Sequence, residues 1–476
     1  MNDTNIEKIK QDFVLKILNQ TYASEEYINK VLEPIIFEIK KNKDKTPEEI
    51  VDNLLRKSTI SLSNEMANIL QSGTNTLIPG YTFGIKAGNI DIKIYGGNFG
   101  NQNQVTNNTI FDIASISKMY TQLICYNLIN EGYFSFDSKI EELDERFTSL
   151  GDLTVKDITT FSSTFNTPGR IDDQTTTDKV YEVLFNTKVV EKDKYNYNDI
   201  GMIILKEVME KTTGLSYEEL LKKYITHRLD LPDTHLILPE DKKALFTGSG
   251  NEALGLTNDA KAVVLGGYSG HAGVKTTSDD LLKFAMAPFN KQGLIPEQYI
   301  KDLYSKNPFI NDGSRGVVGS AKLANPKGLE TSDSSILAPK IGYSAAGSTR
   351  TQVESGIYSL KNSDYVVGTT VLLNPSAINH EEVFEIERKI NEQRKNYALE
   401  KNIEFRPISI MKKYQFEGNE YHQVSSQGFI SYVTSTDPMI TKNSEFMMQL
   451  LFLQEVIATY EKDYQIDYKK EHHIGR

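Results

Sequence analysis

The chain has 476 residues, of which 39% are hydrophobic and 25% charged, so it can fold into up to about three domains and is no disordered polymer. Its 53 basic and 64 acidic side chains give a net charge of −11, which disfavours binding to nucleic-acid backbones. The single cysteine, Cys125, excludes an intramolecular disulfide and a multi-cysteine zinc site.

No segment has the pattern of an export signal or a membrane span. The first 20 residues mix charged with apolar side chains and lack the continuous apolar core of a signal peptide. The most apolar late segment, 446–458, contains Gln449, Gln454 and Glu455 and is too short to cross a bilayer core of about 30 Å. One cysteine is also compatible with a reducing compartment. We therefore expect a cytoplasmic protein that does not bind membranes.

Residues 1–75 are predicted to form a helical N-terminal extension. Apolar residues recur at helical spacing in the first 20 residues and again over 31–39. A third helix is predicted to begin at Thr46, because a threonine followed three residues later by Glu49 is a capping-box pattern.

The following segment alternates between sheet and helix patterns. Two β-rich runs flank Gly88-Asn89 and predict a hairpin, after which a long apolar-periodic helix is predicted from Phe111 to a terminating Gly132. Helices dominate from there to about residue 300. Two β-rich runs then flank 361–363, so the sheet is predicted to be split around a helical insertion.

The sequence Ser115-Ile116-Ser117-Lys118 can carry nucleophilic chemistry. Residues three apart lie on one face of a helix, so the Ser115 hydroxyl and the Lys118 amine can meet. A serine needs a base to become a nucleophile, and free amides at a helix start can stabilise the oxyanion that forms. The same spacing recurs at 409–412, without a hairpin before it, so the letters alone do not identify a site.

Three segments, taken in order, resemble motifs of one family. NTIFDIASISKMYTQL at 108–123 is similar to the family's strand-to-helix motif with its reactive serine. YNDIGMIILKEVMEKTTGLSYEELLKKYI at 197–225 is similar to its tyrosine motif, and GHAGVKTTSDDLLKF at 270–284 to a later one. The chain thus resembles serine β-lactamases and penicillin-binding proteins, in the branch of class C β-lactamases, D-alanyl-D-alanine carboxypeptidases and esterases. The likeness covers about residues 78–400.

The resemblance implies an α+β fold, in which an antiparallel sheet is flanked by helices and carries an inserted helical lobe over about 133–275. This domain would occupy 76–400. It would lie between the N-terminal extension, 1–75, and an α/β C-terminal extension, 401–476.

The resemblance also implies the roles of the site residues. Ser115 would be the acylated nucleophile, Lys118 its proton partner and Tyr197 a second general acid or base. A phenol beside a lysine ammonium is drawn towards phenolate and can relay a proton. Asp199 stands where many relatives carry asparagine and would bind Lys118 or a substrate amide. No metal or cofactor is implied, and the adjacent histidines at 472–473 are interpreted as solvated.

The last motif of the family, Lys- or His-Thr-Gly on the strand that lines the site, is altered here. Counting back from the final strand favours Gly347-Ser348-Thr349, with Ser348 and Thr349 as substrate-binding residues. Lys340-Ile341-Gly342 and Tyr343-Ser344-Ala345 remain alternatives. His271-Ala272-Gly273 has similar letters, but it precedes a predicted helix start at 277–279 and is interpreted as a glycine-permitted turn that re-enters the sheet domain. Another family stretch reads ITTFSSTF at 158–165, with Phe161 at the histidine.

Two functions follow as hypotheses. The first is a serine hydrolase that acts on a small ester, amide or D-amino-acid peptide through an acyl-enzyme, with a small molecule or short peptide as its expected substrate. The second is a binding or regulatory protein that kept the fold and lost turnover. The altered last motif and about 75 additional residues at each end favour this alternative.

Overall fold

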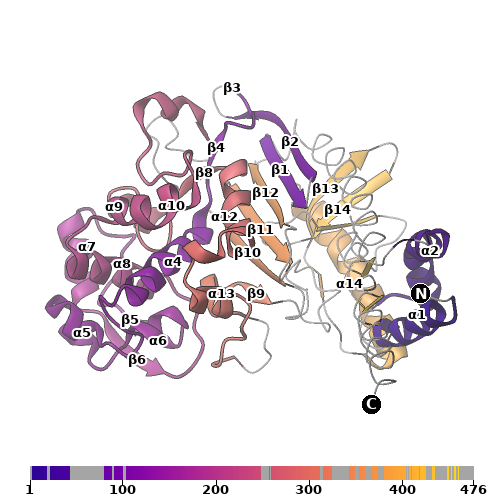
Figure 1. Ribbon diagram of the computed structural model, residues 1–476, viewed down its shortest axis with the longest axis horizontal. Helices are drawn as coiled ribbons and strands as arrows, with labels where there is room; N and C mark the ends of the chain where they lie inside the picture. Colours follow the sequence, from indigo (N-terminus) through magenta and orange to yellow (C-terminus); the bar gives the residue numbers. More distant parts are fainter. Residues whose placement is uncertain are drawn as a thin grey trace, which may run out of the picture.

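The computed structural model describes residues 3–18, 22–42, 80–87, 90–99, 103–247, 259–310, 315–323, 342–348, 353–360, 366–372, 380–403, 410–416, 419–424 and 431–434, with a few single positions elsewhere. A central sheet separates a helical lobe from a group of helices and strands that contains the described parts of both terminal segments (Figure 1). Within the ranges just given, no helix is both long and apolar enough to cross a membrane.

Seven described strands form the central sheet, and each strand is antiparallel to its neighbours. Their order differs from the chain order, because the hairpin that begins the domain pairs with the last of the later strands. In spatial order they are β3 (Asn103–Gln104), β2 (Ile90–Phe99), β1 (Gly80–Ala87), β12 (Val366–Leu372), β11 (Val353–Leu360), β10 (Gly342–Ser348) and β9 (Lys322–Leu323). The predicted split sheet is confirmed.

Both predicted hairpins form. β1 pairs with β2 in register from Gly80 opposite Gly97 to Ala87 opposite Ile90, around the two residues that were predicted as the turn. β11 pairs with β12, which in turn pairs with β1 from the other side. Helix α12 (Ser278–Asn290) packs across β1, β12 and β11 and covers one face of the sheet. Thr277 caps this helix, which starts within the predicted helix start at 277–279.

The helical lobe lies on the other side of α12 from the terminal segments (Figure 1). Its helices are α4 (Ser117–Asn130), α5 (Ile140–Leu143), α6 (Val155–Thr159), α7 (Thr177–Phe185), α8 (Ile200–Thr213), α9 (Tyr217–Leu221), α10 (His227–Leu229) and α11 (Ala260–Val264), with α13 (Glu297–Leu303) packed on α4. The lobe also contains a hairpin of β5 (Ser163–Asn166) and β6 (Lys188–Lys192). The prediction of a helical lobe missed this hairpin.

The predicted start of the long helix at Phe111 is wrong. Phe111 lies in β4 (Ile110–Asp112), which pairs with β7 (Phe246–Thr247) and β8 (Lys275–Thr277), and a 3₁₀ turn, η1 (Ala114–Ile116), separates it from α4. A short apolar run fits a strand and a helix equally well, and pairing with β8 decided between them. The predicted end is right, because Gly132 has φ +82° and its amide donates to Ile129.

Helix α4 forms the centre of the hydrophobic core. Twelve of its residues, from Ser117 to Leu128, are buried, so the helix is enclosed on all sides and is not an amphipathic surface helix. Tyr120 stacks on Phe284 of α12 with ring centroids 3.8 Å apart, which joins α4 to the sheet layer. The Ser115–Lys118 segment therefore leads into a buried helix.

The N-terminal helices contact α14 (His380–Lys401) and the C-terminal extension. Helices α1 (Asp3–Leu18) and α2 (Glu25–Lys41) are the two helices predicted near the N-terminus; the predicted start at Thr46 lies outside the described residues. Helix α14 packs on β13 (Ile410–Phe416), which continues into β14 (Asn419–Val424) and β15 (Ser431–Thr434). Tyr397 of α14 donates to the Ala23 carbonyl at 3.3 Å, and Phe13 contacts Phe452 edge to face.

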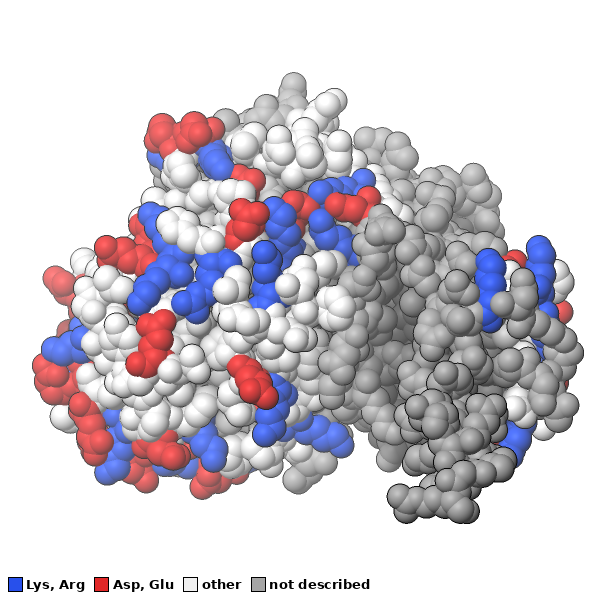
Figure 2. All heavy atoms as spheres, viewed as in Figure 1, with Lys and Arg blue, Asp and Glu red and all other residues white. Residues whose placement is uncertain are grey.

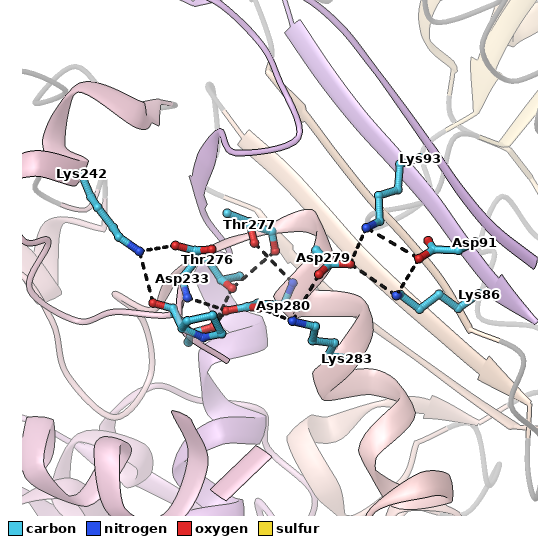
Figure 3. Close-up of polar contacts among 12 residues, drawn as sticks. Lys86, Asp91, Lys93, Asp233, Lys242, Thr276, Thr277, Asp279, Asp280 and Lys283 are labelled. Atoms are coloured by element: carbon cyan, nitrogen blue, oxygen red, sulfur yellow. Dashed lines mark hydrogen bonds and ion pairs between the residues drawn. The ribbon is translucent and has the colours of Figure 1, made fainter. Parts of the chain in front are cut away.

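Ion pairs join the first hairpin to α12 (Figure 3). Asp279 Oδ1 lies 2.7 Å from Lys93 Nζ and 3.3 Å from Lys86 Nζ, and its other oxygen lies 3.3 Å from Lys283 Nζ. The neighbouring Asp280 accepts a hydrogen bond from the Asp233 amide at 2.7 Å. On the face drawn in Figure 2, basic and acidic side chains are interspersed over the described surface.

Candidate active site

Ser115 is positioned by a strained turn between β4 and α4. Ala114 has φ +46°, a left-handed conformation that is uncommon for a residue with a side chain. The carboxylate of Asp112 holds this turn, because its Oδ1 accepts the Ala114 amide at 2.7 Å and its Oδ2 accepts the Thr257 hydroxyl. Ser115 follows within η1 and is partly exposed, whereas the residues on either side of it are buried.

Lys118 is the second residue of α4 and is fully buried. Its Nζ donates to Ser115 Oγ at 2.9 Å and to the His271 carbonyl at 3.2 Å, and it forms an ion pair with Asp199 Oδ1 at 2.9 Å. The spacing of three residues thus brings the Lys118 amine within hydrogen-bonding distance of the Ser115 hydroxyl, as the sequence predicted. All three contacts are suited to an ammonium, which donates three hydrogen bonds.

Tyr197 and Asp199 enter the site from the loop before α8. Tyr197 remains 43% exposed, and Lys118 Nζ lies 4.8 Å from the centroid of its ring. Phe161 also stacks on that ring. Asp199 occupies the N-cap position of α8, and its Oδ2 accepts a hydrogen bond from Lys261 Nζ at 3.2 Å.

These charges set the protonation states of the site. Burial alone would lower the pKa of Lys118, but charge interactions and hydrogen bonds with Tyr197 and Asp199 outweigh it and hold the pKa above its ordinary value. Burial would raise the pKa of Asp199, but Lys118, His271 and Lys261 outweigh it and hold that pKa well below its usual range. The resting site therefore contains an ammonium at Lys118 and a carboxylate at Asp199.

Strand β10 lines the site at Gly347. A Cβ atom at this position would overlap the Ile113 carbonyl and would lie 2.8 Å from the Ser115 amide nitrogen, so only glycine allows this approach of the strand. Ser348 follows as the last residue of β10, whereas Thr349 lies outside the described residues. The placement that the sequence favoured thus begins with the residue that faces Ser115.

The structure places the alternative positions of the last motif away from the contact with Ser115 or outside the described residues. Lys340 and Ile341 lie outside the described residues, and Tyr343-Ser344-Ala345 precede Gly347 in the same strand. His271-Ala272-Gly273 form a turn, as predicted: Ser269 and Ala272 form an antiparallel bridge, Gly273 has φ +107°, and β8 follows. This turn nevertheless contacts the site through the His271 carbonyl.

Two pairs of residues at the site were not predicted. Lys261 binds Asp199 from α11, and the buried His271 ring places Nε2 2.7 Å from Asp259 Oδ1. No periodic pattern links Lys261 to Asp199, which is 62 residues away, so the sequence offered no signal for this pair. In the described part of the chain, no group of three or more His, Cys, Asp or Glu side chains could hold a metal ion.

Comparison with known proteins identifies the family. A model of the Beta-lactamase family matches residues 78–350, which is more than half of the chain. A beta-lactamase of Yersinia enterocolitica is 23% identical over 197 residues, which cover 40% of this chain and 49% of that protein. The chain thus spans about half the length of this curated relative.

Solved structures share the fold. A beta-lactamase/D-alanine carboxypeptidase from Yersinia pestis, complexed with citrate, has a TM-score of 0.51 at 16% identity, covering 64% of this chain and 90% of its own. A class C beta lactamase has a TM-score of 0.52 at 17% identity, covering 68% and 94%. The matched family model and this shared α+β fold show that the chain belongs to the serine β-lactamase and penicillin-binding-protein-like family.

Proposed function

We propose that the protein is a serine hydrolase that transfers the acyl group of a small ester, amide or D-amino-acid peptide to water through an acyl-enzyme on Ser115. The observation that carries this proposal is the 2.9 Å contact between Lys118 Nζ and Ser115 Oγ, in a site where Asp199 holds the same amine. Membership of a family that consists generally of serine hydrolases supports it.

The proton of Ser115 is transferred to Tyr197 in this proposal. Lys118 is an ammonium and already donates to Ser115 Oγ, so it cannot also accept the serine proton. The Tyr197 ring lies against the same ammonium, so a phenolate formed during the transfer would lie next to a positive charge. Tyr197 is thus the general base and Lys118 the cation that makes it effective.

The reaction then has two halves. Ser115 Oγ bonds to the substrate carbonyl carbon while its proton moves to Tyr197, and the electron pair of the carbonyl moves to its oxygen. Collapse of this intermediate breaks the bond to the leaving group, which takes the proton from Tyr197. Water attacks the acyl-enzyme in the same way and regenerates Ser115. The amides of Ser115 and of β10 beside Gly347 would bind the oxyanion.

A covalent probe tests the nucleophile. A fluorophosphonate should add its mass to the peptide that contains Ser115, and a panel of p-nitrophenyl esters should be hydrolysed. Ser115→Ala should abolish labelling and should lower turnover by at least about 10³-fold, since the covalent route is lost. Lys118→Ala should slow labelling strongly.

Ser409→Ala is the matched control, because Ser409 is followed by the same pattern of letters. It should leave labelling and turnover unchanged. Labelling at Ser409, or no labelling and no hydrolysis with any ester or D-amino-acid amide, would contradict the hydrolase. The second outcome would favour a binding or regulatory protein, for which the altered last motif is the motivating observation.

A further inference from the structure

Asp199 is held between two lysines. One carboxylate oxygen lies 2.9 Å from Lys118 Nζ and the other lies 3.2 Å from Lys261 Nζ. Lys118 contacts Ser115 directly, whereas Lys261 reaches the nucleophile only through Asp199 and Lys118. The Lys261 side chain is 30% exposed, so it is the outer member of this row and is open to solvent.

Several other charged or titratable groups face this row. Tyr197 comes from the same loop as Asp199, and its ring lies against Lys118. The His271–Asp259 pair is adjacent, and both of its members interact electrostatically with Asp199. Asp172, on the loop before α7, interacts with Lys261 at longer range and is paired with Arg170. Lys261 is therefore the one cation bound to Asp199 from outside the core of the site, among the described residues.

The position of Lys261 has a predictable electrostatic consequence. A carboxylate shared by two cations attracts each of them less than a carboxylate bound to one, because the second cation offsets part of its negative charge. Removal of the Lys261 charge would leave Asp199 to act fully on Lys118 and on the neighbouring phenol. Loss of a proton from the group of residues around Lys118 would then require a higher pH.

We propose that Lys261 is a positioning residue that, through Asp199, sets the lower limit of the pH range in which Ser115 can be deprotonated. This inference rests on the hydrolase activity proposed above, which supplies the measurement. Lys261 takes no part in bond making. Lys261 keeps the negative charge of Asp199 partly neutralised. The Ser115–Lys118–Tyr197 group therefore becomes reactive at a lower pH than in a protein without the Lys261 charge.

The test is the pH profile of p-nitrophenyl acetate hydrolysis, with kcat and KM determined separately at each pH. In Lys261→Met, the acidic limb of kcat/KM should move to higher pH by about one unit. In Asp199→Asn, the same limb should move to lower pH, because the negative charge itself is removed. Lys261→Arg keeps the cation and should restore the wild-type limb.

Lys192→Met is the matched control. Lys192, on the hairpin of the lobe, is 27% exposed and is paired with Asp152 and Asp157, so its environment resembles that of Lys261 without contact to Asp199. Its profile should equal the wild type. A purely structural role of Lys261 would lower kcat at every pH and leave the limb in place, and this result would overturn the proposal.

The two proposals fail in different ways. An inactive wild-type protein with an unlabelled Ser115 would contradict the hydrolase itself. An active wild-type protein whose limb is unmoved in Lys261→Met, or is moved equally in Lys192→Met, would contradict only the role of Lys261.

Discussion

The rings of Phe161 and Tyr197 are stacked, with centroids 5.3 Å apart and planes 25° from parallel. Phe161 is buried and has φ +53°, which is a strained conformation for a bulky residue. The Phe161 carbonyl accepts a hydrogen bond from the Asn196 amide at 2.7 Å. Phe161 therefore holds both the Tyr197 ring and the backbone just before Tyr197. Strain of this kind, of about 1–3 kcal/mol, persists where the surrounding structure over-determines it and is frequent at functional sites.

Phe161→Leu should therefore impair catalysis more than folding. Leucine keeps most of the buried apolar volume but lacks the flat ring on which Tyr197 rests, so the phenol would lose its fixed orientation towards Ser115. We expect kcat/KM for p-nitrophenyl acetate to fall by about tenfold, and the free energy of unfolding to fall by about 1.5 kcal/mol or less. Ester hydrolysis and urea unfolding measure the two effects.

The control is Phe185→Leu in the lobe. Phe185 stacks on Tyr181 with centroids 5.5 Å apart and an interplanar angle of 17°, a similar aromatic pair without contact to the site. Its loss should lower stability to a similar extent and leave kcat/KM unchanged. Equal losses of activity in both variants would mean that Phe161 acts only through stability.

Gly347→Ala should disrupt the wall of the site. The added methyl group would meet the Ile113 carbonyl and the Ser115 amide, which are both backbone atoms and cannot move aside cheaply. We expect β10 to be displaced from Ser115, with a loss of about 1–3 kcal/mol in the free energy of unfolding and at least about a 100-fold loss of kcat. Labelling rate and urea unfolding measure both effects.

Gly293→Ala provides the comparison for this substitution. A methyl group at Gly293 meets no atom within 4 Å, so the variant should behave as the wild type or be slightly more stable. Full activity in Gly347→Ala would show that β10 does not form the oxyanion-binding wall.

The sequence predicted those parts of the site in which local spacing decides geometry. Ser115 and Lys118 are three residues apart on adjoining helical turns, so their contact follows from helix geometry alone. The position of Tyr197 in space depends on a loop, and only the resemblance to a family suggested it. Lys261 binds Asp199 although the two residues are 62 positions apart, and no sequence pattern around either residue predicts that contact.

The fold was predictable to a similar degree and for similar reasons. The first hairpin and the end of α4 carry turn glycines, and these boundaries were predicted correctly. Phe111 was assigned to a helix because its apolar neighbours fit both periods, and the strand follows from pairing with β8, which lies more than 160 residues away. The hairpin β5–β6 was missed because its strands are short and separated by α7.

Asp279 should make the fold sensitive to acid. Burial would raise its pKa, but the hydrogen bond to Lys93 and the charges of Lys86 and Lys283 outweigh it and lower the pKa from 3.8 to about 2. The unfolded chain therefore takes up a proton before the folded chain does as pH falls. The stabilisation by Asp279 is fully present above about pH 4 and is lost between about pH 4 and pH 2.

Asp279→Asn should consequently lower the free energy of unfolding by about 1–2 kcal/mol at pH 7, after allowance for the partial exposure of the carboxylate, and by almost nothing near pH 2. Asp91→Asn is the matched control, because Asp91 contacts the same Lys86 and Lys93 (Figure 3) but is 48% exposed. Its effect at pH 7 should be smaller, since solvent screens an exposed pair. Urea unfolding at several pH values measures the difference between the two variants. If Asp279→Asn were equally destabilising at both ends of the pH range, the loss would come from packing at the start of α12 and not from the charge.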